Sequence, residues 1–300
     1  MRSIRGFKMD GYIIYNCSFY GDKVKRQTEE LKEEFNKKGK NVEVVSSDSF
    51  FVGVNEDGNF FCTLEKADFI IYLDKDTTTA EILQKSGYKL FNSPKAIGIC
   101  DDKAKTYSAL SGEGINLVKT YFAPKRYFGK DGERVLEYAA EKLGFPMIVK
   151  KKTGSLGGEV YKADNLSEFE EISEKLQSEE HVFQEYITPS GRDIRVIVIG
   201  GKVVAAMERV NERDFRSNIE LGGEGRKIEL SESVKRLAEK CARVLGLDYC
   251  GVDILLKGGK PLCCEVNSNA FFLGIEKVTG ISVSGLYADY VLNVVYGKKR

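Results

Sequence analysis

The sequence has few of the residues that build metal clusters or disulfide frameworks. Its seven cysteines are scattered through 300 residues, form no Cys-x-x-Cys pair and are accompanied by a single histidine, His181. The scatter argues against a zinc site, and the odd count argues against a disulfide framework. We therefore expect reduced thiols, mostly buried, and a structural role for His181.

A large charge of one sign and long apolar runs are also missing. The 46 basic and 45 acidic residues leave a formal net charge of +1, which gives no electrostatic reason for binding nucleic acid or an anionic membrane. The longest apolar runs, such as 196–199 and 203–207, have the length of strands rather than of membrane helices. We expect a cytoplasmic protein with no nucleic-acid or membrane partner, and a homo-oligomer is compatible with the sequence.

Strands and helices alternate in the first third of the chain. Residues 11–16, 41–45 and 67–73 are predicted as buried strands, with amphipathic helices over about 22–38 and 78–84. This alternation favours a small parallel α/β domain that ends near residue 95. The residues after the first strand lack the glycine triplet of a dinucleotide-binding unit, which excludes that kind of Rossmann domain.

Periodicity changes from helical to strand-like further along the chain. The helices that we predict there cover residues 93–113, 131–143, 166–177, 231–246 and 283–295. The predicted strands cover 146–150, 159–162 and 182–187, followed by two hairpins, 192–199 with 202–210 and 250–256 with 261–267. The last two thirds should therefore be antiparallel sheet with helices.

A glycine-rich stretch between two predicted strands is the first candidate for chemistry. It runs from Lys150 through Gly154 to Gly157 and Gly158. Such a loop can fold over a polyphosphate, with backbone N–H groups as ligands and a lysine as point charge. An ordinary turn is the alternative that these residues alone leave open.

Two acids and an amide at the ends of the last hairpin are the second candidate. Asp253, Glu265 and Asn267 offer the hard oxygen ligands that Mg²⁺ prefers. Solvated acids at strand ends are the alternative. A two-residue turn at 258–259 would place Asp253 opposite Cys264, with Glu265 on the other face. A shared metal therefore requires a three- or five-residue loop, which Gly259 favours, or a bulge of equal effect.

The metal hypothesis fixes the register of this hairpin. Asp253 should pair with Glu265 across the ladder, and Asn267 should lie one step along the same face. Ile254 and Cys264 should be buried behind them. A third candidate precedes the hairpin, where Arg216, Ser217 and Asn218 could hold a γ-phosphate and a carboxylate that becomes an acyl phosphate. A polar surface loop is the alternative there.

Eight short motifs, in order, resemble the RimK-type ATP-grasp ligases, the alpha-L-glutamate ligase-like carboxylate–amine ligases. They are Ile148-Val149-Lys150, Gly154-Ser155-Leu156-Gly157, Gln184-Glu185-Tyr186-Ile187, Asp193-Ile194-Arg195, Phe215-Arg216-Ser217-Asn218, Gly251-Val252-Asp253-Ile254-Leu255, Glu265-Val266-Asn267-Ser268 and Gly274-Ile275-Glu276. The resemblance covers about residues 95–290. It implies an α/β (α+β) chain, with an ATP-grasp fold preceded by a small Rossmann-like pre-ATP-grasp domain. The expected boundaries are 1–95, 96–187 (central and lid subdomain) and 188–300 (C-terminal subdomain with the metal site).

The same resemblance implies ATP and Mg²⁺, with Mn²⁺ as the alternative ion, and assigns site residues. Lys103 and Lys150 would contact the phosphates. The loop that closes over the phosphates would consist of Ser155, Leu156, Gly157 and Gly158. The hinge beside the adenine would be formed by Gln184, Glu185, Tyr186 and Ile187. Of these, Glu185 and Tyr186, together with Asp193, would contact the nucleoside. Arg216, as the catalytic residue, Ser217 and Asn218 would contact the γ-phosphate and reacting carboxylate, and Asp253, Glu265 and Asn267 would hold the metal.

The activity implied is ATP-dependent formation of an amide or peptide bond through an acyl phosphate. The partners would be a small-molecule or peptide carboxylate donor and an amine acceptor, with glutamate or another amino acid added. Two alternatives stay open: a kinase that phosphorylates a hydroxyl, and a non-catalytic nucleotide-binding regulator. The chain departs from the family at residues 268–272, Ser-Asn-Ala-Phe-Phe, where a small residue and Ser-Pro-Gly are usual. That departure bears on the acceptor more than on the ATP chemistry.

Overall fold

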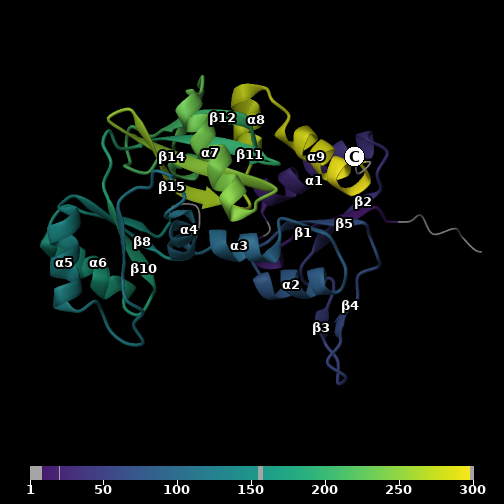
Figure 1. The fold of residues 1–300 in the computed structure, drawn as a ribbon, viewed down its shortest axis with the longest axis horizontal. Helices are drawn as coiled ribbons and strands as arrows, with labels where there is room; N and C mark the ends of the chain where they lie inside the picture. The colour runs from purple at the N-terminus through teal and green to yellow at the C-terminus, as the bar shows by residue number, and fades with distance from the viewer. Residues whose placement is uncertain (1–8, 20, 155–157, 298–300) are drawn as a thin grey trace, which may run out of the picture.

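The computed structural model describes residues 9–19, 21–154 and 158–297. Three sheets of four or five strands, with helices packed against them, make up most of this part of the chain (Figure 1). We call them the N-terminal, middle and C-terminal sheets.

The N-terminal sheet is parallel, as predicted, with strand order β2-β1-β5-β6. Its strands are β1 (Gly11–Tyr15), β2 (Val42–Ser46), β5 (Phe69–Leu73) and β6 (Leu90–Phe91). Helices cover both faces, which explains why β1 and β5 are almost continuously apolar. One face packs on α1 (Asp22–Lys37) and α9 (Val283–Tyr296), the other on α2 (Thr77–Lys85) and α3 (Pro94–Cys100).

The middle sheet is antiparallel, in the order β7-β10-β8-β9. It consists of β7 (Thr120–Phe122), β8 (Met147–Lys151), β9 (Val160–Ala163) and β10 (His181–Glu185). α5 (Glu133–Leu143) and α6 (Leu166–Leu176) lie together beside it (Figure 1), and buried residues such as Leu136 and Phe169 form its core. His181 is buried within this unit and bonds Asp131 at 2.8 Å, consistent with a structural role.

The C-terminal sheet is antiparallel, in the order β13-β12-β11-β14-β15. Its strands are β11 (Arg192–Ile199), β12 (Lys202–Val210), β13 (Glu224–Lys227), β14 (Tyr249–Lys257) and β15 (Lys260–Asn267). α4 (Lys103–Leu110) and α7 (Glu232–Leu245) pack on one face. The other face joins the core of the N-terminal sheet, together with α8 (Leu273–Thr279) and α9. Both predicted hairpins are confirmed.

Several features differ from the sequence prediction. The single helix expected over 93–113 is broken into α3 and α4, because the Asp102 carboxylate accepts the N–H groups of Ala104 and Lys105 and begins a new helix. A short, unpredicted hairpin of β3 (Val52–Val54) and β4 (Phe60–Cys62) projects from the N-terminal unit (Figure 1). The short strands β6, β7 and β13 and helix α8 were also not predicted. Among the described residues no single helix could cross a membrane; α8 and α9, bent by 115°, pass by length and composition only as a pair.

Candidate active site

The hairpin of β14 and β15 places the two predicted metal-binding acids side by side. Asp253 pairs with Glu265, and Asn267 pairs with Gly251 one step along the same face, which confirms the predicted register. Of the two means that the sequence left open, the longer loop favoured by Gly259 is absent, because Lys257 pairs with Lys260 across a two-residue turn. A bulge between the Asp253 and Ile254 pairs supplies the extra residue instead.

The bulge also changes which cysteine is buried behind the acids. Ile254 is fully buried, as predicted, but its cross-strand partner is Cys263, and Cys263 is the fully buried thiol. Cys264 is the extra residue. It turns to the same side as Glu265 and lines the cavity described next, so its predicted burial behind the sheet is wrong.

A cavity of about 560 Å³ collects most of the predicted site. It is lined by residues of α1, the middle sheet and the C-terminal sheet. Thirteen of the seventeen predicted residues line it: Lys103, Lys150, Gln184, Glu185, Tyr186, Ile187, Asp193, Arg216, Ser217, Asn218, Asp253, Glu265 and Asn267. Gly158 does not, and Ser155, Leu156 and Gly157 lie outside the described residues.

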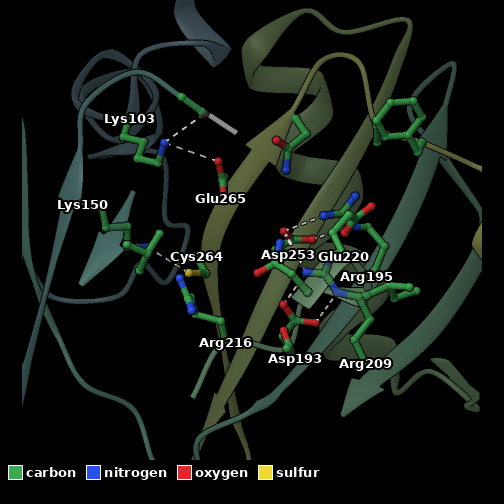
Figure 2. A pocket seen from close by; sticks show the side chains of 18 of the residues that line it. Lys103, Lys150, Asp193, Arg195, Arg209, Arg216, Glu220, Asp253, Cys264 and Glu265 are labelled. Carbon is green, nitrogen blue, oxygen red and sulfur yellow. Dashed lines mark hydrogen bonds and ion pairs between the residues drawn. The ribbon is translucent and has the colours of Figure 1, made fainter. Parts of the chain in front are cut away.

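Two lysines define one end of this cavity. The Lys103 ammonium, at the start of α4, lies 3.4 Å from the Gly154 carbonyl oxygen and 3.6 Å from a Glu265 carboxylate oxygen. Lys150, on β8, is 7% exposed, and among the described residues its ammonium bonds the Cys264 sulfur at 3.5 Å (Figure 2). Burial raises the pKa of the Cys264 thiol, so Lys150 faces a neutral group. A buried ammonium without a carboxylate partner favours an anionic ligand.

Two arginines that were not assigned from the sequence hold Asp253. Arg195 lies opposite Asp253 on β11, and Nε and Nη2 both bond the carboxylate, the second at 2.9 Å. Arg209, opposite Asp193 on β12, bonds that carboxylate twice and also lies 3.0 Å from Asp253. Although burial acts to raise it, the two guanidinium groups leave the pKa of Asp253 below its ordinary value. The acid is therefore ionised.

The predicted hinge is held by its side chains. The Gln184 amide donates to the Tyr107 hydroxyl at 2.8 Å and to the Thr120 hydroxyl at 2.9 Å. Glu185 forms an ion pair with Lys257, and Ile187 is buried. The side chains of Gln184 and Ile187 therefore fix the strand end in place, which suits a hinge that would present its backbone to a base.

The Arg216 guanidinium lines the cavity beside its own loop. Nη2 donates to Asp214 at 2.7 Å and Nε at 3.1 Å, and this pairing lowers the pKa of Asp214 while burial acts to raise it. Ser217 is buried and Asn218 precedes the short 3₁₀ turn Ile219–Leu221. The three side chains are thus brought to the cavity together, as the sequence predicts.

The residues at the hairpin fit a magnesium ion. A carboxylate offers about four lone-pair positions, and the two arginines use three of them at Asp253, so one remains. The Asn267 side chain has no hydrogen-bond partner among the described residues, and Glu265 faces Lys103 at 3.6 Å. Within the described part of the chain no three His, Cys, Asp or Glu side chains are grouped for a metal. Mg²⁺ would therefore use two carboxylates and an amide, with phosphate oxygens and water completing its shell.

The sheets and this cavity together define an ATP-grasp protein. The model of the RimK-like ATP-grasp domain matches residues 100–291, and the chain belongs to that family. Beta-citrylglutamate synthase B of Danio rerio is 37% identical over 226 residues, which cover 74% of this chain and 55% of that protein. A probable alpha-L-glutamate ligase of Marinomonas sp. is 35% identical over 219 residues, 72% of this chain and 71% of that protein.

Solved structures agree on the fold. The ATP-grasp ligase PsnB, complexed with its minimal precursor, superposes with a TM-score of 0.72 at 20% identity, covering 95% of this chain and 99% of that chain. The same ligase has been solved with its minimal precursor, Mg and ADP. The chain spans a little over half the length of the beta-citrylglutamate synthases that it matches.

Proposed function

We propose that this protein is an ATP- and Mg²⁺-dependent carboxylate–amine ligase. The observation that carries the proposal is the pairing of Asp253 with Glu265 on the face of the cavity that the buried Lys150 also lines. Lysines that can bind phosphates and acids that can bind Mg²⁺, placed in one cavity, suit a nucleoside triphosphate with its metal ion. Membership of the RimK-like family supports the same conclusion.

The proposed reaction has two steps. A carboxylate oxygen of the donor attacks the γ-phosphorus of ATP, the bond to the β-phosphate oxygen breaks, and ADP leaves with an acyl phosphate formed. The nitrogen of the amine then attacks the acyl carbon, the carbon–oxygen bond breaks and phosphate leaves. An ammonium nitrogen gives up two protons on the way to the amide.

The chain contributes charge and orientation rather than a covalent nucleophile. Lys103 and Lys150 would bind the phosphates, and the charge of Arg216 would meet the carboxylate as it gains the phosphoryl group. Mg²⁺, when bound, supplies further positive charge at the phosphate oxygens. Arg195 and Arg209 keep the Asp253 carboxylate ionised and hold it in a fixed orientation.

The substrates are proposed from the relatives. The names of both relatives, a beta-citrylglutamate synthase and a probable alpha-L-glutamate ligase, contain glutamate. We therefore propose an amino acid as the amine, with glutamate tested first, and a small molecule or peptide as the carboxylate donor.

A screen of acids and amines tests the proposal, with ADP release as the signal and mass spectrometry of the product. An amide, ADP and phosphate are expected. A phosphorylated acceptor would identify a kinase, and nucleotide binding without turnover would identify a regulator.

A further inference from the structure

The segment that departs from the family, residues 268–272, is joined to the N-terminal unit. The Phe272 N–H donates to the Gln27 side-chain oxygen at 3.1 Å, and both residues are buried. Gln27 lies on α1, whose buried residues Leu31 and Phe35 pack in the core shared by the N-terminal and C-terminal sheets. The hydrogen bond therefore helps to hold α1 in a fixed position relative to the end of β15.

That contact determines where Lys23 lies. Lys23 is four residues before Gln27 and so occupies the same face of α1, one turn earlier. Its ammonium stands 4.2 Å from the centroid of the Phe271 ring and forms an ion pair with Glu220, in the turn after Arg216. An ammonium group is thus held between an aromatic face and a carboxylate, and all three residues line the cavity.

This cradle, Glu220 with Phe271, lies at the end of the cavity away from the phosphate-binding lysines. Glu220 and Arg195 lie beyond Asp253 as seen from Lys103 and Lys150 (Figure 2). Although burial acts to raise it, the hydrogen bond and charge of Lys23 leave the pKa of Glu220 below its ordinary value, so the group is a carboxylate at neutral pH.

We propose that the Glu220–Phe271 cradle binds the ammonium group of the amine acceptor, and that Lys23 holds this place while no acceptor is bound. The inference rests on the proposed ligase function. An aliphatic amine is mostly an ammonium ion at neutral pH, and a carboxylate facing an aromatic ring suits that ion. The cradle lies past Asp253 as seen from Lys103 and Lys150, in the same cavity, so an amine bound there would share that cavity with the nucleotide.

The direction in which Lys23→Met changes the KM for the amine separates this role from the alternative, in which Lys23 itself binds a substrate carboxylate. Lys23→Met removes a competing ammonium, so the KM for the amine should fall by about threefold or more. Glu220→Gln should raise that KM about tenfold, and Phe271→Leu about two- to fivefold. The KM for ATP should stay unchanged in all three.

Lys37→Met is the matched control, because Lys37 lies on the same helix and pairs with Glu34 on the surface. It should leave both KM values unaltered. A rise in the amine KM with Lys23→Met, or no rise with Glu220→Gln, would overturn the proposal.

A second measurement does not depend on turnover. Crystals of the Lys23→Met variant soaked in methylammonium chloride should show the ion between Glu220 and Phe271, and crystals of Lys23→Met/Glu220→Gln should not. An empty cradle in the first crystal would refute the inference. If the substrate screen finds no amide but methylammonium is bound there, the ligase proposal fails and the ammonium site stands.

Discussion

Replacing Arg209 with methionine tests the charge network that holds Asp253. Arg209 is 4% exposed, bonds Asp193 with two nitrogens and lies 3.0 Å from Asp253. Methionine keeps an unbranched apolar stem but lacks the guanidinium group, so it leaves Asp193 without its charged partner. Removing one partner of a buried pair costs about 3–5 kcal/mol of unfolding free energy. At roughly 2 °C per kcal/mol for a chain of this size, the melting temperature should fall by about 6–10 °C.

The matched control is Arg192→Met on the neighbouring strand. Arg192 pairs with Glu208 at 3.3 Å, but its side chain is 45% exposed, so the loss should stay below about 1 kcal/mol. Denaturant unfolding of both variants gives the comparison, and adding Asp193→Asn to Arg209→Met should recover part of the loss. Equal destabilisation by Arg192→Met and Arg209→Met would show that the buried network does not stabilise the sheet in the way argued.

Three further predictions follow from single residues. Lys150→Ala should weaken ATP binding, measured by calorimetry, with an unchanged thermal melt; a folded variant with full affinity would contradict the phosphate role. Arg216→Ala should lower kcat about 10²–10³-fold with little change in the KM for ATP, and an effect confined to that KM would contradict its role. Glu30 has its pKa raised to about 7 by burial and by the Glu276 carboxyl beside it. The folded state thus keeps a proton that the unfolded chain loses near pH 4.5, so stability falls as pH rises through 7. Glu30→Gln should therefore raise the melting temperature more at pH 8 than at pH 5, and an equal effect at both would refute the shift.

The elements with long, regular patterns could be predicted from the sequence. The parallel strands of the first third, the two Gly-Gly hairpins and the long helices all follow from periodicity of two or 3.6. The missed strands β3, β4, β6, β7 and β13 have two to four residues, too few to show a period. The break at Asp102 was missed because a helix cap within a helical pattern changes only local hydrogen bonds and leaves the apolar spacing intact.

The site was predicted by residue type but not by pairing. Asp253 and Glu265 could be placed on one face because a shared metal demands it, whereas the bulge at Cys264 could not be distinguished from a longer loop. Arg195 was part of a recognised motif, and its spacing of two from Asp193 on one strand was the available signal. Its contact with Asp253 depends on β14 lying beside β11, and strand order across a sheet is set by tertiary packing.

Isotope transfer tests the central claim most directly. The carboxylate donor found by the screen is labelled with ¹⁸O in both carboxyl oxygens, and the inorganic phosphate released during amide formation is analysed by mass spectrometry. An acyl phosphate requires one labelled oxygen to leave with each phosphate, so one ¹⁸O per phosphate is predicted. Unlabelled phosphate released with the amide, or a product phosphorylated on a hydroxyl in place of an amide, would contradict the ligase mechanism.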